Sequence, residues 1–124
     1  MTDPLKILLV EDNELNRDML ARRLKRRGFD VETAVDGQWA LGALELMMPD
    51  VVLMDMNMPG MDGWEATRRI RQNAKFQTLP IIALTAHATP EDRQRCMDAG
   101  CSAFHVKPVS MDELIEVISS LVGG

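Results

Sequence analysis

The stretch Met-Asp-Met-Asn-Met-Pro-Gly-Met-Asp-Gly at residues 54–63 decides the fold of this chain. It ends a short apolar run with an acid, Asp55, and then turns into a helical pattern. A short apolar run bounded by turn signals is typical of a strand buried on both faces of a parallel sheet. A second such run, at residues 5–10, is followed directly by Glu11 and Asp12. Because ligands of open α/β sheets bind outside the carboxyl ends of the strands, we expect these acids to converge at one site.

Apolar, strand-like runs alternate with helical patterns five times, with no linker, repeat or low-complexity stretch between them. This alternation predicts βαβ units and a parallel sheet. The expected fold class is therefore α/β, with a doubly wound, five-stranded parallel sheet in a single domain that covers residues 1–124. The expected strands lie near residues 6–10, 31–35, 51–54, 81–84 and 103–106.

Capping signals predict where the five helices begin and end. The first helix is expected at residues 14–27 with Gly28 as its stop, and the second from Gly37 to before Pro49. The third helix follows Asp62-Gly63. The fourth has Thr89 as N-cap, Pro90 at its first position and Gly100 at its stop, and the fifth opens with a capping box at residues 110–113.

Helical spacing predicts which side chains of these helices face the core. The residues expected to point inward are Leu15, Met19, Leu20 and Leu24 in the first helix, Trp64, Ala66 and Ile70 in the third, and Leu114, Ile115, Ile118 and Leu121 in the fifth. Arg68, Arg69 and Arg71 are expected to face solvent. Trp39 and Trp64 lie in different helices, so partial burial is expected for them instead of a base-stacking ladder.

Composition limits the classes of protein that this chain can belong to. Its 124 residues are 46% hydrophobic, which is enough to build one core, and its formal net charge is −5. The negative charge argues against nonspecific binding to nucleic acid or to an anionic membrane. No leader and no apolar run of membrane-spanning length is present, so a cytoplasmic protein is expected. Cys96 and Cys101 lack zinc-type spacing and are expected to be reduced thiols.

Polar side chains follow four of the predicted strands, where one chemistry can use all of them. The residues are Glu11 and Asp12 after the first strand, Asp55 and Asn57 after the third, Thr85 after the fourth and Lys107 after the fifth. Carboxylates gathered in this way repel each other unless a hard cation lies between them, and Mg²⁺ suits such a site. Asp55 can then attack a phosphoryl group, while Lys107 and Thr85 bind its oxygens.

Four sequence strings together resemble the receiver domain of two-component response regulators. They are Val-Glu-Asp-Asn at 10–13, the stretch at 54–63, Leu-Thr-Ala at 84–86 and Lys-Pro at 107–108. Any one of them is a weak signal, but four in order at the ends of successive strands are specific. The resemblance covers essentially the whole chain and implies a flavodoxin-like (βα)5 fold with strand order 2-1-3-4-5.

The resemblance also implies a function and a role for each site residue. The chain would be a signalling module that takes a phosphoryl group from a histidine kinase or a phosphotransfer protein and switches its binding to an output protein. Asp55 would be the phosphoacceptor, and Asp12, Asp55 and the backbone carbonyl of Asn57 would bind Mg²⁺, with Glu11 acting through bound water. Thr85 and Lys107 would contact the phosphoryl group, Thr85 and Phe104 would form the switch, and the Lys107-Pro108 bond would be cis. Phe104 stands where tyrosine is common, so a mechanism that depends on the tyrosine hydroxyl is not available.

Two other functions compete with this one. An aspartate-dependent phosphohydrolase acting on an external substrate typically has a second aspartate two positions after the nucleophile as general acid, but Asn57 occupies that position. A flavin or nucleotide carrier needs a glycine- or hydroxyl-rich phosphate loop after the first strand, where this chain has Glu11-Asp12-Asn13-Glu14. We therefore expect a phosphorylation-controlled module that is not an enzyme toward outside substrates. We also expect a stand-alone, single-domain regulator in preference to a receiver domain excised from a larger protein.

Several other residues suggest functions that a simpler reading explains. His87 either borders the phosphorylation site or faces solvent in a loop, and His105 is expected to have a packing role. The methionines near Asp55 are interpreted as core packing. The basic cluster at residues 22–27 is interpreted as a solvated helix end, because cations there complement the helix dipole.

Overall fold

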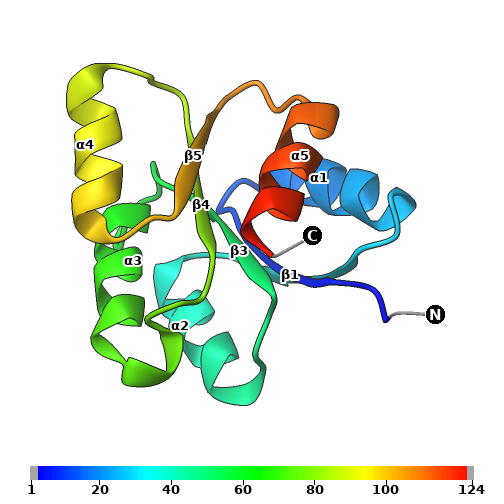
Figure 1. Cartoon of the computed structure of the whole chain (residues 1–124), viewed down its shortest axis with the longest axis horizontal. Helices are drawn as coiled ribbons and strands as arrows, with labels where there is room; N and C mark the ends of the chain where they lie inside the picture. Colours follow the sequence, from blue (N-terminus) through cyan, green and yellow to red (C-terminus); the bar gives the residue numbers. More distant parts are fainter. Residues whose placement is uncertain (1–2, 123–124) are drawn as a thin grey trace.

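The computed structural model describes residues 3–122 and contains a five-stranded parallel sheet with helices on both faces (Figure 1). The strands are β1 (Lys6–Val10), β2 (Asp30–Ala34), β3 (Val51–Asp55), β4 (Ile81–Thr85) and β5 (Ala103–Val106). Their order in the sheet is β2-β1-β3-β4-β5, so the predicted flavodoxin-like fold and strand order are confirmed. The predicted strand positions agree to within one residue.

The helices are α1 (Glu14–Arg26), α2 (Gly37–Leu46), α3 (Gly63–Gln72), α4 (Pro90–Ala99) and α5 (Met111–Leu121). A single turn of 3₁₀ helix, η1 (Ala74–Phe76), lies between α3 and β4 and was not predicted. Each α-helix begins at a capping side chain that accepts a hydrogen bond from a backbone N–H of the first turn; the caps are Asn13, Asp36, Asp62, Thr89 and Ser110. Each α-helix follows a strand of the parallel sheet, so its N-terminus faces the end of the sheet at which the strands end and the site is predicted.

The sheet separates two apolar cores, because alternate residues of each strand point to opposite faces. On one face, Leu8 and Val52 pack under α2, α3 and α4. On the other face, Ile7 and Val51 pack under α1 and α5. Residues 7–10 of β1 and all residues of β3 are fully or almost fully buried, as the uninterrupted apolar runs predicted.

The start of α3 lies tightly against the end of β3. A Cβ on Gly63 would contact the backbone carbonyl of Asp55 and would lie 2.7 Å from the Cα of Met56. The Gly63 N–H also donates to the Met56 carbonyl at 3.1 Å. Only glycine fits here without moving the backbone, so the sequence Asp62-Gly63 fixes the loop that follows Asp55.

The predicted inward face of α1 is partly wrong. Leu15 is 69% exposed and Met19 51% exposed, whereas Leu20 and Leu24 are buried together with Ala21. Leu15 precedes Leu24 by nine residues, which is two and a half turns, so the two side chains lie on opposite sides of the helix. The apolar residues of α1 therefore form a core face and a separate exposed face.

Two other side-chain predictions are wrong. Arg71 does not face solvent, because its guanidinium donates to the carbonyls of Gly100 at 2.9 Å and Phe76 at 2.6 Å and so ties α3 to the ends of η1 and α4. Trp39 is 60% exposed instead of partly buried, while Trp64 is buried as the helical spacing predicted. In α5, Leu114 and Ile118 are buried, whereas Ile115 and Leu121 are only partly buried against the core.

Candidate functional site

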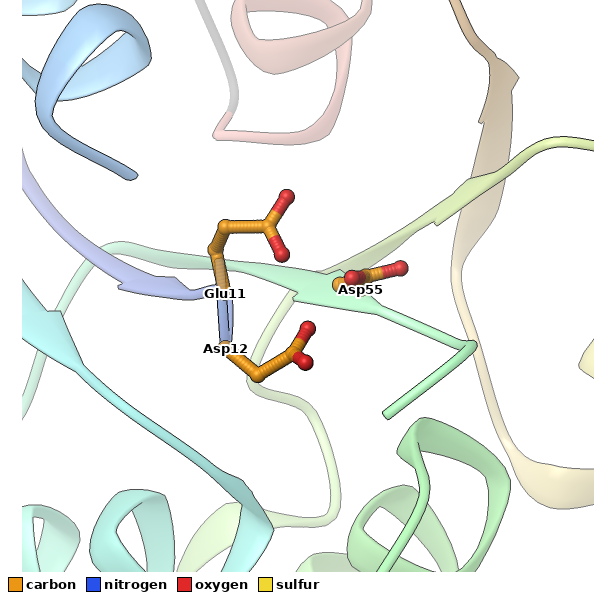
Figure 2. Close-up of side chains that lie close together, drawn as sticks. All are labelled: Glu11, Asp12 and Asp55. Carbon is orange, nitrogen blue, oxygen red and sulfur yellow. The ribbon is translucent and has the colours of Figure 1, made fainter. Parts of the chain in front are cut away.

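Three carboxylates meet at the carboxyl ends of β1 and β3 (Figure 2). Glu11 and Asp55 are almost fully buried, at 4% and 2% exposure, whereas Asp12 is exposed. One oxygen from each residue lies within 4.8 Å of an oxygen from the other two. The strand ends thus bring together the acids that the sequence predicted would converge, with two of them shielded from water and one open to it.

Lys107 places a positive charge against the two buried acids. Its Nζ lies 3.1 Å from Oδ1 of Asp55 and 3.6 Å from Oε1 of Glu11. The Lys107 N–H donates to the Thr85 carbonyl at 2.7 Å, which holds the residue at the end of β5 beside β4. The bond between Lys107 and Pro108 is cis, the geometry that the family resemblance implied.

Backbone amides orient the two buried carboxylates. The Asn57 N–H donates to Oδ1 of Asp55 at 3.2 Å, and the Asn13 N–H donates to Oε2 of Glu11 at 3.2 Å. Arg17 of α1 donates to the backbone carbonyl of Glu11 at 3.0 Å. Sequence analysis missed the role of Arg17, because a surface arginine in a helix carries no signal of a contact with a loop that precedes it.

Burial raises the pKa of the Glu11 carboxyl to about 7. Loss of solvation is the largest cause, followed by the hydrogen bond and the charge of Asp55, while the Asn13 N–H and Lys107 act in the opposite direction. Without a cation, Glu11 is therefore partly protonated at neutral pH. One lysine does not balance three acids, so the cluster still favours additional positive charge.

The donor set fits a hard divalent cation. The three acids offer only oxygen ligands, which Mg²⁺ prefers, and the exposure of Asp12 leaves room for the waters that Mg²⁺ retains. Asn57 is exposed at the same loop. Binding of the cation would stabilise Glu11 in its ionised form.

Thr85 and Phe104, the two residues predicted to form the switch, make contacts outside the carboxylate cluster. The Thr85 hydroxyl donates to the His87 carbonyl at 3.1 Å and accepts from the His87 N–H at 3.2 Å. The ring of Phe104, half-buried on β5, lies 4.7 Å from the guanidinium carbon of Arg93 on α4. His87 itself is exposed, whereas His105 is buried and its Nε2 accepts from the Ser110 N–H at 3.3 Å, which confirms its packing role.

A pocket of about 320 Å³ adjoins the acids on the side of α1. Glu11 and Lys107 line it from the site, Met19 and Arg23 from α1, and Pro108 from the loop after β5. Met19 was expected in the core, and its exposed position instead gives this entrance an apolar wall.

No helix within residues 3–122 is long and apolar enough to cross a membrane.

Comparisons with known proteins agree with this geometry. Residues 7–119 match the family described as the response regulator receiver domain. The sensor histidine kinase RcsC of Salmonella typhi is 42% identical over 117 residues, which are 94% of this chain but only 12% of RcsC. The polar-differentiation response regulator DivK of Brucella anthropi is 33% identical over 97% of this chain and 98% of its own length.

Two solved structures share the fold closely. The receiver domain of sensor histidine kinase PA1611 from Pseudomonas aeruginosa, with a magnesium ion in its active site cleft, has a TM-score of 0.90 at 37% identity and covers 98% of this chain and 99% of its own. The chemotaxis protein CheY4 of Vibrio cholerae has a TM-score of 0.90 at 32% identity over 95% of this chain and 98% of its own.

The raised pKa of Glu11 predicts that Mg²⁺ affinity depends on pH. The cation competes with the Glu11 proton, so the apparent affinity should rise about tenfold between pH 6 and pH 8. The same shift lowers metal-free stability as pH rises from 4.5 to about 7, because the folded state holds this proton more tightly than the unfolded chain. Mg²⁺ titrations followed by calorimetry at several pH values measure the first effect, and thermal melts without metal measure the second.

Glu11→Gln is the matched control, because it keeps the shape of the side chain and removes its titration. This variant should bind Mg²⁺ with an affinity that changes little over the same pH range. An equally steep pH dependence in Glu11→Gln would show that another group controls the site.

Proposed function

We propose that this chain, which belongs to the family of response regulator receiver domains, accepts the phosphoryl group on Asp55. The family makes it a phosphoacceptor module of two-component signalling with a magnesium site, and not an enzyme for external substrates. The observation that carries the assignment to Asp55 is its position. Asp55 is one of the two buried acids in the cluster, and its carboxylate is the one closest to the Lys107 ammonium, at 3.1 Å.

The residues around Asp55 divide the work of the transfer. An Asp55 carboxylate oxygen attacks phosphorus, the P–O bond forms, and the bond between phosphorus and the donor nitrogen breaks. The Lys107 ammonium already lies beside Asp55, and it would form an ion pair with the oxygens of the incoming phosphoryl group. Asp12 and Asp55, with the Asn57 carbonyl, would bind Mg²⁺, and Glu11 would act through a metal-bound water. The bound ion would offset the charge of the acids and of the incoming phosphoryl group.

A phosphohydrolase fits this site less well. The side chain two positions after Asp55 is the Asn57 amide, which cannot transfer a proton to a leaving group. Without a general acid at that position, the site lacks a group to protonate the leaving oxygen of an external phosphate ester. The arrangement therefore suits transfer of a phosphoryl group to Asp55 more than turnover of an outside substrate.

We infer that the phosphoryl donor is a histidine kinase or a histidine phosphotransfer protein that docks on α1. The relatives include the sensor histidine kinase RcsC, and this chain matches a segment that is 12% of its length. Leu15 and Met19 form an exposed apolar pair on α1, and Met19 lines the pocket that leads to Lys107. An apolar pair beside a reactive site is a natural place for a partner to bind.

We further infer that Thr85 and Phe104 carry the change in charge to the surface formed by α4, β5 and α5. Among residues 3–122, the Thr85 hydroxyl is held only by the backbone of His87, from which a phosphoryl oxygen can draw it. Phe104 can then exchange its contact with Arg93 for the space that Thr85 leaves. Thr85 and Phe104 would thus exchange between an inactive and an active arrangement. Phosphorylation can shift this equilibrium only by the difference in free energy that it makes between the two arrangements, commonly about 1–3 kcal/mol.

Asp55→Asn should abolish phosphorylation, because the amide retains the shape of the carboxylate but lacks its nucleophilic oxygen. The measurement is intact mass after incubation with acetyl phosphate and Mg²⁺. The wild-type chain should gain the mass of one phosphoryl group, and excess chelator should suppress the gain. An unchanged gain in Asp55→Asn would refute the assignment.

Thr85→Ala should uncouple the site from β5 while leaving Asp55 able to accept phosphate. The test compares amide NMR shifts of wild type and variant with and without beryllofluoride, which stands in for the phosphoryl group. In wild type, shifts should reach Phe104 and residues 91–96, and in the variant they should remain near Asp55. If Thr85→Ala transmits the full set of shifts, the proposed coupling is wrong.

A further inference from the structure

A groove of about 770 Å³ lies between α2 and the edge strand β2, and none of the three clustered carboxylates lines it. Its apolar wall is the outer side of α2, where Trp39, Ala43 and Leu46 follow at spacings of four and three residues. The opposite wall contains Asp30 and Glu32 of β2. The groove therefore has one apolar and one acidic side.

The apolar wall is a second apolar face of α2. The helix already buries Ala40 and Leu44 in the core, so Trp39 and Leu46 are not needed there. Trp39 is 60% exposed and Leu46 is 91% exposed. Contiguous exposed apolar side chains of this size mark surfaces that bind a partner.

The acidic wall defines the charge of that partner. Asp30, Glu32 and Asp36 line the groove, and Lys6 is the only basic residue among the described residues that line it. Within residues 3–122, none of these three acids forms a salt bridge. An occupant that carries apolar side chains and several positive charges would match both walls.

The exposed face of α1 carries this combination. Leu15, Met19, Arg22 and Arg26 follow at spacings of four, three and four residues, so they share one side of the helix, and all four are exposed. The apolar pair lies in the first half of the helix and the two arginines in the second. Helices α1 and α2 stand on opposite sides of the sheet (Figure 1). One molecule thus displays the two complementary surfaces in places where they cannot meet within the same chain.

We propose that α1 of one copy docks in the groove between α2 and β2 of a second copy. Leu15 and Met19 would pack on Trp39 and Leu46, with Arg22 and Arg26 beside the acids of β2. Because α1 and the groove lie on opposite faces of the sheet, we expect the contact to extend head to tail instead of pairing reciprocally across a two-fold axis. Each copy carries a net charge of −5, whose repulsion keeps the association weak and dependent on concentration. Docking on α1 would also cover Met19 at the entrance to the carboxylate site, so a second copy would compete for this face with the phosphoryl donor of the proposed function.

Complementation between two variants tests the pairing. One variant, Arg22→Glu with Arg26→Glu, loses the basic surface and retains the groove. The other, Trp39→Ala, loses the apolar wall and retains α1. All three side chains are exposed, so both variants should fold as wild type does. Sedimentation velocity, with no phosphodonor present, should show wild type growing in average size from micromolar to submillimolar concentration, each variant remaining monomeric, and their mixture forming a 1:1 complex.

Two further variants serve as controls outside both surfaces. Met97→Ala removes an exposed methionine from α4, and Arg68→Glu with Arg69→Glu reverses two exposed charges on α3. Both should associate as wild type does. A monomeric wild type at all concentrations, undiminished association in either surface variant, or a mixture that stays monomeric would each overturn the proposal.

Discussion

Repulsion among the three carboxylates at the ends of β1 and β3 is the constraint on which the site depends. Their oxygens lie within 4.8 Å of one another, and two of the three side chains are buried, where charges interact more strongly than in water. Lys107 neutralises part of this charge, while burial and then the neighbouring Asp55 raise the pKa of the Glu11 carboxyl to about 7. The protein maintains a site whose ionised form is completed by a cation.

The parallel sheet imposes this arrangement. Adjacent parallel strands have their carboxyl ends on the same side of the sheet, so an acid after β1 and an acid at the end of β3 become neighbours. Lys107, the residue after β5, reaches these acids across β4. The tight approach of Gly63 to the Asp55 carbonyl fixes the loop after β3. Chemistry is thereby confined to one edge, while α1 and α2 offer binding surfaces on opposite faces of the sheet.

Much of the fold was readable from the sequence, because the information is local. The runs around Leu8 and Val52 showed strands buried on both faces, and the capping residues located the helix starts to within a residue. The sides of helices were harder to predict. Leu15 and Met19 have the hydrophobicity of core residues, but the width of the stripe that α1 buries depends on how the helix sits on β1 and β2. For the same reason, the sequence did not reveal the backbone contacts of Arg71 or the exposure of Trp39.

The acid cluster lowers the stability of the metal-free protein in order to bind a cation, and Asp12→Asn tests this most directly. Asp12 is the exposed member, so the amide removes one charge from the cluster without opening a cavity in the core. The measurement is the thermal melt of wild type and variant, each with and without Mg²⁺. The account predicts a higher melting temperature for the variant without metal and a smaller increase on adding Mg²⁺. A variant that is less stable without metal, with an undiminished increase from Mg²⁺, would contradict it.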